Sequence, residues 1–378
     1  MKANRMLPFL ILLSLAVMSL QAADKNRIAW KFKTNAAIHS TPLVDGNVIF
    51  IGSTDSVFYA ISINDGSEIW HYKTDYSINS KAAIFSNLVI FESGFKLYAL
   101  DKKTGKLKWS FVASTGKPEM SIGFTDYHHS SPIIHENIAY YGDGWGNLNG
   151  VDVETGKLKF QYSIKTDSAA IRTTPAIKND VIYFGDWAGH VYAVSLSNKS
   201  LLWQYTLINR RPYYGMVTSD MIIRDTLLYF GSQHDVFSPL GLKKGKPAWT
   251  FIDPNKTYLP STPVFYKNSV IIGSTINTYK IYCLTDGKEK WSCKSDGIFF
   301  VQPVIIDSVI IMNTSYFGEK GTVFMVNGNN GSIINEYHFN SAAPASPAIA
   351  GNKIFIGNGD GFLYAFYLKE FIYSKVSD

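Results

Sequence analysis

The chain has 378 residues, 46% of them hydrophobic and 15% aromatic, so it can bury a sizeable core and does not have the composition of a disordered protein. Its formal net charge is +6, and Lys and Arg are scattered among Asp and Glu. This distribution argues against the clustered basic surface of a nucleic-acid-binding protein, so we expect no nucleic-acid partner.

The first 23 residues have the layout of a secretory signal peptide. Lys2 and Arg5 precede an apolar run over 7–20, and small residues follow it. This run is shorter than the ~20 residues of a transmembrane helix, and no later stretch is long enough to span a bilayer. We therefore expect a signal peptide over 1–23 and a periplasmic or secreted mature protein over 24–378, with an uncleaved N-terminal anchor as the alternative.

Beyond this segment, a repeat of 40 to 50 residues runs almost to the end of the chain. Its first landmark is a Pro, here called the anchor, followed ten residues later by a Gly. Five copies are complete: Pro42 and Gly52, Pro132 and Gly142, Pro175 and Gly185, Pro263 and Gly273, and Pro347 and Gly357. Three copies are degenerate: Ala82 and Glu92, Met221 and Gly231, and Pro303 and Asn313. The landmark therefore marks eight units.

Two further landmarks recur in the same units. One is an alternating apolar segment, typical of a β-strand, at 57–61, 96–100, 147–151, 190–194, 280–284, 322–326 and 362–366. The other is a turn Gly four residues before an aromatic residue: Gly66 and Trp70, Gly105 and Trp109, Gly156 and Phe160, Gly245 and Trp249, and Gly287 and Trp291. Trp203 lacks the Gly, and Asn335 replaces the aromatic residue after Gly331.

Each unit supplies four short strands separated by turn signals. We therefore predict an all-β fold, an eight-bladed β-propeller of four-stranded antiparallel blades, in a single domain over 24–378. The segment 27–34 is a lone outer strand, whereas the last unit ends after its third strand near residue 366. We expect this N-terminal strand to complete the last blade and close the ring, with 371–376 as the competing segment.

The only two cysteines lie on either side of a predicted turn at Asp286-Gly287. A two-residue turn would pair Cys283 with Lys290 and place Cys293 on the opposite face of the hairpin, which forbids a disulfide. A longer, bulged loop would change this parity. We expect two buried free thiols, with a bridge between the two cysteines as the alternative.

The repeats resemble those of the quinoprotein, or pyrroloquinoline-quinone-type, propeller family. The resemblance rests on Ser131-Pro132 and on the segments 97–101, 104–109 and 139–142, and it covers residues 27 to about 367. It implies that most of the repeated Trp residues dock on a turn Gly of the neighbouring blade. The family includes quinone-dependent dehydrogenases and the propeller subunit of the outer-membrane β-barrel assembly machinery, so the resemblance leaves the activity open.

Candidate functional residues lie in two sets of loops. In a four-stranded blade, the loop entering the innermost strand and the loop between the second and third strands open on one face, which we call the funnel face. Ligand-binding candidates in these loops are His39, Trp145, Trp187, Arg210, Arg211 and His234, and catalytic candidates are His128, His129, Arg172, Tyr213 and Tyr214. Cations, imidazoles and rings together suit an anionic or sugar-like ligand. Capping of the loops by the same polar side chains is the alternative.

These observations favour an exported, monomeric binding scaffold that contacts a protein or carbohydrate on the funnel face and has no catalysis of its own. The alternative is a polyuronide lyase, an enzyme that acts on acidic polysaccharides. In that enzyme Arg172 would neutralise the substrate carboxylate. His128 or His129 would serve as base, and Tyr213 or Tyr214 as acid.

A quinone-dependent dehydrogenase is the third interpretation. In the family, such enzymes generally use an adjacent Cys pair and a calcium site with Glu, Asn and Asp ligands. This sequence has no adjacent Cys pair. No His, Cys or carboxylate spacing resembles a zinc site either. We therefore expect no metal site and no cofactor, neither pyrroloquinoline quinone nor calcium.

Overall fold

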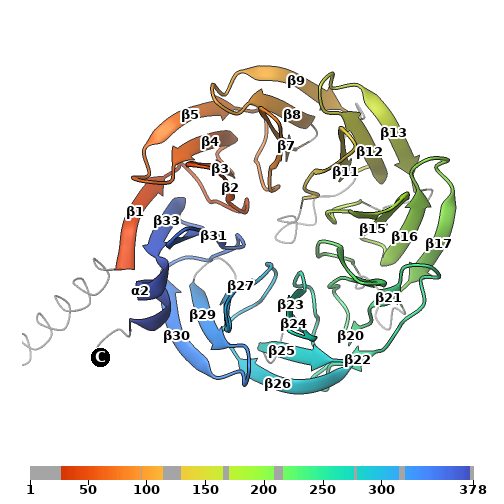
Figure 1. Ribbon diagram of the computed structural model, residues 1–378, viewed down its shortest axis with the longest axis vertical. Helices are drawn as coiled ribbons and strands as arrows, with labels where there is room; N and C mark the ends of the chain where they lie inside the picture. Colours follow the sequence, from red (N-terminus) through yellow and green to blue (C-terminus); the bar gives the residue numbers. More distant parts are fainter. Residues whose placement is uncertain are drawn as a thin grey trace, which may run out of the picture.

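The computed structural model describes residues 27–94, 96–113, 129–164, 170–207, 216–275, 279–314 and 320–374. The expected signal peptide over 1–23 lies outside these ranges. The described chain forms eight antiparallel blades around a central axis, so the predicted eight-bladed propeller is confirmed (Figure 1). No helix in the described part of the chain is long and apolar enough to cross a membrane.

Six blades take their four strands from the axis outward in chain order. Blades 1 and 2 contain β2 (Leu43–Asp45), β3 (Val48–Gly52), β4 (Val57–Ser62) and β5 (Glu68–Lys73), then β6 (Ala83–Phe85), β7 (Leu88–Ser93), β8 (Lys96–Asp101) and β9 (Leu107–Val112). Blades 3 and 4 contain β10 (Ile133–His135), β11 (Ile138–Gly142), β12 (Asn147–Asp152) and β13 (Leu158–Ser163), then β14 (Ala176–Lys178), β15 (Val181–Gly185), β16 (His190–Ser195) and β17 (Leu201–Thr206). Blades 6 and 7 contain β23 (Val264–Tyr266), β24 (Ser269–Gly273), β25 (Lys280–Thr285) and β26 (Lys288–Lys294), then β27 (Val304–Ile306), β28 (Val309–Asn313), β29 (Gly321–Asn327) and β30 (Ile333–Phe339).

Blade 5 is the irregular one. Its pairing is split between β18 (Ile222–Arg224), β19 (Leu227–Tyr229) and β21 (Leu240–Gly241) on one side, and β20 (Val236–Phe237) with β22 (Phe251–Ile252) on the other. Pro239 separates β20 from β21, and a proline has no N–H to donate to a neighbouring strand. The third strand of this blade is therefore broken at a proline.

Blade 8 joins the two ends of the chain. Its strands are β31 (Ala348–Ala350), β32 (Lys353–Gly357), β33 (Phe362–Tyr367) and, outermost, β1 (Ile28–Lys33). The register pairs Phe32 with Leu363, so the expected closure by the N-terminal strand is confirmed. The competing segment instead contributes to helix α2 (Leu368–Tyr373), which packs against β30 and β33.

The core lies between the blades rather than within one sheet. The second and third strands of most blades are buried on both faces, because alternate side chains face the two neighbouring blades. Phe58 of blade 1 and Phe91 of blade 2, for example, stack with ring centroids 3.9 Å apart. Removal of this apolar surface from water holds adjacent blades together.

The repeated Trp residues dock as the family resemblance implies. Trp70 of blade 1 lies against Gly105 of blade 2, where an added Cβ would approach the ring to 2.6 Å, and its indole N–H donates to Lys102 O at 3.1 Å. The same contact recurs for Trp30 and Gly66, Trp109 and Gly156, Trp203 and Gly245, Trp249 and Gly287, and Trp291 and Gly331. Glycine is required here for space and for a positive φ, which is 69° at Gly105.

Two blade contacts depart from this pattern, and each has a substitute. Between blades 3 and 4, Phe160 stands for Trp and Lys199 stands for Gly, with Lys199 Nζ 5.6 Å from the Phe160 ring centroid. Between blades 7 and 8, Asn335 stands for Trp. Its Nδ2 donates to Phe371 O at 3.2 Å and Ser374 O at 2.9 Å, so it binds the C-terminal end of α2.

The predicted register of the two cysteines is wrong. Cys283 lies opposite Trp291, not Lys290, because a β-bulge follows Cys283, and Cys293 therefore lies on the same face. The two side chains belong to one core cluster and are free, buried thiols. Burial raises the pKa of both thiols.

Candidate functional site

In blades 2 to 6, a repeated hydroxyl group fixes the loop that enters the innermost strand. Ser130, two residues before its anchor, accepts a hydrogen bond from Gly142 N–H at 2.8 Å and donates to Thr173 O in blade 4 at 2.9 Å. Equivalent bonds join Thr173 to Gly185, Ser219 to Gly231 and Ser261 to Gly273. Each hydroxyl thus ties the entry loop to the second strand of its own blade, on the funnel face.

The residue three positions before the anchor differs around the ring. In blades 1 to 4 it is polar, and in blades 5 to 8 it is mostly apolar or Pro. The eight residues in order are His39, Asn79, His129, Arg172, Thr218, Pro260, Phe300 and Pro344. Next to the axis, the funnel face of blades 1 to 4 therefore carries imidazole, amide and guanidinium groups. In blades 5 to 8, Thr218 and Pro260 are buried, and Phe300 and Pro344 are partly exposed.

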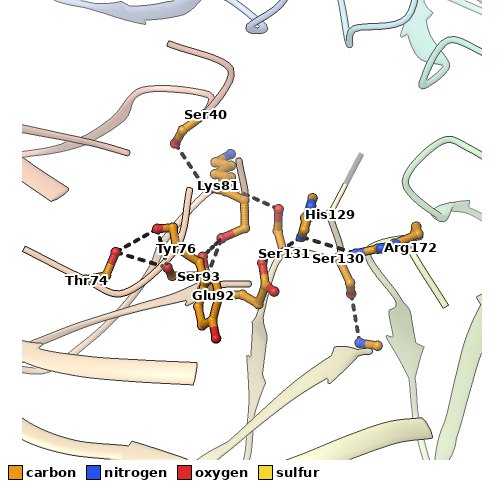
Figure 2. A network of polar contacts seen from close by, with 12 residues as sticks. Ser40, Thr74, Tyr76, Lys81, Glu92, Ser93, His129, Ser130, Ser131 and Arg172 are labelled. Atoms are coloured by element: carbon orange, nitrogen blue, oxygen red, sulfur yellow. Dashed lines mark hydrogen bonds and ion pairs between the residues drawn. The ribbon is translucent and has the colours of Figure 1, made fainter. Parts of the chain in front are cut away.

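A buried ionic network joins blades 2, 3 and 4 (Figure 2). His129 Nδ1 lies 3.0 Å from Glu92 Oε2 and 3.3 Å from Arg172 Nη1, so the imidazole lies between the carboxylate and the guanidinium group. The side chains of His129 and Glu92 are only 10% and 7% exposed. Such a pair is stabilised in the interior only because each charge faces a partner.

Glu92 is the residue that sequence reasoning missed as a functional candidate. Six of the eight units have Gly ten residues after the anchor, because a Cβ there would overlap the next entry loop, as between Gly52 and Ile78 at 2.1 Å. Glu92 is the only charged residue at this position. A carboxylate where the fold normally needs Gly was the signal that could have identified it.

His129 can bind only one of its two partners through Nδ1 when the imidazole is neutral. The Arg172 guanidinium carries donors only, so a neutral imidazole either donates Nδ1–H to Glu92 or accepts a hydrogen bond from Arg172 at the same atom. Arg172 also lies with its Cζ 5.4 Å from the Trp187 ring, a cation–π contact. With Glu92 ionised, the three groups carry a net charge between zero and +1.

Two further groups lie next to this network. Burial lowers the pKa of His39 to about 4. A hydrogen bond with Asn79 raises this pKa, and the nearby His129 lowers it. His39 is therefore a neutral imidazole at neutral pH. The Tyr141 hydroxyl is buried, and its burial, followed by the charges of Asp143 and Glu92, raises its pKa.

The acids of the loops between second and third strands cap their own loops. Asp143 Oδ1 accepts from Trp145 N–H at 2.9 Å and from Asn147 N–H at 2.8 Å. Asp186 accepts from His190 N–H at 2.8 Å. His234 Nδ1 likewise accepts from Val236 N–H at 3.1 Å. The capping role that the sequence left open therefore applies to these side chains.

The structure brings four predicted residues together: His39, His129, Arg172 and Trp187. Trp145 and His234 lie in loops of blades 3 and 5, outside the contacts that join Glu92, His129 and Arg172. The remaining candidates, His128, Arg210, Arg211, Tyr213 and Tyr214, fall outside the described residues.

The carboxylates Glu92, Asp143 and Asp186 of the described funnel face are hydrogen-bonded within the protein. No group of three or more His, Cys, Asp and Glu side chains in the described ranges could hold a metal ion. The Glu92 carboxylate contacts the His129 imidazole, and those of Asp143 and Asp186 accept hydrogen bonds from N–H groups of their own loops. The geometry instead offers a carboxylate-paired imidazole next to a guanidinium and an indole.

The comparisons with known proteins agree with the repeat. A family model described as outer membrane protein assembly factor BamB matches residues 16–205, 89–251 and 146–297, which together span more than half of the chain. The crystal structure of BamB from Moraxella catarrhalis has the same fold, with a TM-score of 0.70 at 15% identity, over 89% of this chain and 98% of that one.

Among curated relatives, an alcohol dehydrogenase (quinone), dehydrogenase subunit, of Gluconacetobacter polyoxogenes is 28% identical over 158 residues, which is 36% of this chain and 21% of that subunit. BamB of Yersinia pestis is 26% identical over 160 residues, 39% of each chain. The match thus spans well under two thirds of these relatives. On the evidence of the family model, the chain belongs to the family of the outer membrane protein assembly factor BamB.

Proposed function

We propose that this chain is an exported binding scaffold, without catalysis of its own, that holds a protein partner against the funnel face. The observation that carries the proposal is the two-sided arrangement of the entry loops, polar in blades 1 to 4 and mostly apolar in blades 5 to 8. A surface of this kind resembles a protein interface, where apolar contacts supply affinity and buried charge pairs supply specificity. The family name suggests that the partner belongs to outer membrane protein assembly.

The contacts among the polar residues of the entry loops in blades 1 to 4 favour a binding role over catalysis. Glu92, His129 and Arg172 are paired with one another and nearly buried, and His39 is neutral at neutral pH. Groups held in this way present a fixed pattern of donors and acceptors at little entropic cost on binding.

The test is site-specific photo-crosslinking in cells that produce the protein. A photoreactive side chain at Phe300, and in a second variant at Asn79, should yield a discrete adduct with a protein. The matched control is Asn64, an exposed residue in a turn on the opposite face. Adducts from Asn64 alone, or equal adducts from both faces, would contradict a funnel-face scaffold. A shift in mass that glycosidases remove would point to a carbohydrate instead.

A polyuronide lyase is the second candidate, and one observation favours it. The Glu92 carboxylate lies 3.0 Å from His129 Nδ1, and an acid in this place orients an imidazole so that Nε2 can act as a base. Arg172, next to the same imidazole, is a suitable group to neutralise a uronate carboxylate. The base would take the proton from the carbon next to the carboxylate, and a C=C bond would form as the bond from the neighbouring carbon to the glycosidic oxygen breaks. That oxygen would take a proton from the acid, for which the sequence offers Tyr213 or Tyr214, and leave as an alcohol.

This second candidate has its own assay. Cleavage of a polyuronide by elimination produces an unsaturated end that absorbs in the ultraviolet. If the chain is a lyase, His129→Gln should abolish this signal, and Glu92→Gln should reduce it and shift its pH profile. No signal from any polyuronide tested with the unsubstituted protein rules the candidate out for those substrates.

A further inference from the structure

The exposed apolar side chains of this molecule recur at one position of the repeat. Six of the eleven large hydrophobic residues exposed in the described chain occupy the first or second residue of an outer strand: Ile69, Leu107, Leu158, Leu201, Leu202 and Ile333. Leu201 and Leu202 are 45% and 51% exposed. Single exposed apolar residues are ordinary on a protein surface, whereas repetition at one structural position forms a row.

In blades 2 to 4, lysines accompany these side chains. Lys106 and Lys108 flank Leu107, and Lys157 and Lys159 flank Leu158, all of them exposed. The segments 101–108, 152–159 and 199–202, here called the Lys–Leu edge, contain seven lysines and three carboxylates.

Two of those three carboxylates are engaged within their own turns. Asp101 accepts from the Thr104 hydroxyl at 2.9 Å, and Asp152 accepts from the Thr155 hydroxyl at 2.8 Å. These carboxylates keep their charge, so seven lysines and three carboxylates give the edge a net charge of +4, which the pairing of Asp45 with Lys102 at 2.7 Å reduces to +3.

The fold places the three segments side by side. They are the turns into β9, β13 and β17, which follow one another along a single arc of the outer perimeter (Figure 1). These turns open on the face opposite the funnel face, because they connect the third and fourth strands of each blade. A flat partner can therefore touch all three blades at once without covering the funnel face.

We infer that the Lys–Leu edge docks on an anionic phospholipid surface. Lysines attract such a surface over a distance of about one Debye length, and exposed leucines beside them enter the boundary between headgroups and acyl chains. The same Lys-Leu-Lys pattern in blades 2 and 3, followed by Lys199, Leu201 and Leu202 in blade 4, matches a layer of identical phosphate headgroups better than the varied side chains of a protein epitope. Docked in this way, the propeller would lie with its funnel face directed away from the bilayer.

Vesicle co-sedimentation tests this inference. The protein should start at residue 27, because every described strand lies beyond that point and the apolar run 7–20 would itself bind vesicles. We expect binding to phosphatidylcholine vesicles that contain phosphatidylglycerol, little binding to phosphatidylcholine alone, and release at high salt.

Two variants separate a docking edge from general electrostatics. Loss of two charges in Lys157→Gln/Lys159→Gln should weaken binding about thirtyfold, because each lysine near the membrane contributes about a factor of five. The matched control is Lys288→Gln/Lys290→Gln in blade 6, where Glu289 stands in the place of Leu158, and it should bind unchanged. Leu201→Ser/Leu202→Ser should weaken binding without lowering Tm, since both side chains are exposed.

Three outcomes would overturn the inference: no binding to either vesicle, equal binding to both, or an equal loss in the blade 6 control. Saturable binding to a soluble acidic protein without vesicle binding would assign the edge to a protein partner instead.

Discussion

Ten residues after the anchor, the side chain has almost no room, and this decides both packing and chemistry. A Cβ on Gly231 would lie 2.4 Å from Ser261 O, and one on Gly142 would lie 2.5 Å from Ile171 O, both backbone atoms of the next entry loop. Where the position carries a larger residue, it becomes polar and bonded: Asn313 donates to Ala345 O at 2.8 Å, and Glu92 pairs with His129. The candidate site thus arises from a departure at a crowded backbone position.

Gly231→Ala should lower the free energy of unfolding by about 1–3 kcal/mol, because the added methyl group meets backbone that cannot move away. The matched control in the same blade is Gly241→Ala, where the nearest atom would be Lys246 O at 3.6 Å. Urea denaturation of both variants measures the difference. Equal losses would show that the crowding at Gly231 is relieved elsewhere.

His39 should make the stability of the protein depend on pH. Its pKa is lowered to about 4 in the folded chain, so the unfolded chain, with a pKa of about 6.5, binds more protons between these values. The stabilisation is present above the unfolded pKa and is lost as the pH falls towards about 4. We expect the free energy of unfolding to fall by about 1–2 kcal/mol from pH 7 to pH 5, and by clearly less in His39→Gln. An unchanged slope in the variant would contradict this assignment.

At the scale of the strand and turn, most blades contact the next through a Trp ring that packs against a turn Gly. The two substituted contacts test whether the pattern or the individual residues matter. Phe160 and Lys199 form a compensated pair, in which Lys199 adopts a positive φ of 57° that a Gly would adopt without strain.

Phe160→Trp alone should destabilise the protein, because the Cβ of Lys199 stands where the larger ring would dock. Phe160→Trp with Lys199→Gly should recover the loss, giving a coupling of about 0.5–3 kcal/mol between the two changes. A double-mutant cycle by chemical denaturation measures it. Additive effects would mean that the two residues do not share one contact.

The C-terminal helix should contribute strongly to the last blade contact. Phe371 is fully buried and lies 4.5 Å from the Phe366 ring and 5.6 Å from the Tyr337 ring, centroid to centroid. Phe371→Ala should lower the free energy of unfolding by about 3–5 kcal/mol. Tyr373→Ala, two residues away and 61% exposed, should change it little. Comparable melting temperatures for the two variants would contradict a packing role for α2.

Much at this scale could be predicted from the sequence, and the register of the cysteines shows where prediction failed. The strands could be predicted from alternating apolar residues and the turns from Gly, because both signals depend on residues close together in the sequence. A β-bulge in the pairing of the third and fourth strands recurs at Ala60, Ala99, Gly150, Ala193, Cys283 and Met325, also in blades 3 and 7 where Phe160 and Asn335 replace Trp. The extra residue in the fourth strand reverses the parity of every pair beyond it, and the length of the turn does not reveal it.

The same reasoning applies to the candidate site. His39, His129 and Arg172 could be predicted because they share one repeat position, and the repeat fixes that position in space. Glu92 could not be paired with His129 in advance, because the pairing crosses from the second strand of one blade to the entry loop of the next.

At the scale of the whole molecule, the ring depends on β1. Removal of residues 27–34 should expose the edge of β33, lower Tm and promote self-association, because an unpaired strand edge recruits other strands. The control deletion ends at residue 26. Analytical ultracentrifugation and thermal denaturation of the two proteins measure the effect. A monomeric protein with unchanged Tm would show that the fold closes without β1.

The closure of blade 8 also sets an order of events during synthesis. The first strand of the propeller to emerge is β1, and the strand that it pairs with, β33, is the last. Before β33 exists, Trp30 of β1 can already dock on Gly66 and donate to Ile63 O at 3.1 Å, both in blade 1. The N-terminal strand can therefore stay docked on blade 1 while the other blades form. Completion of the ring therefore requires that every strand of the described propeller has been synthesised.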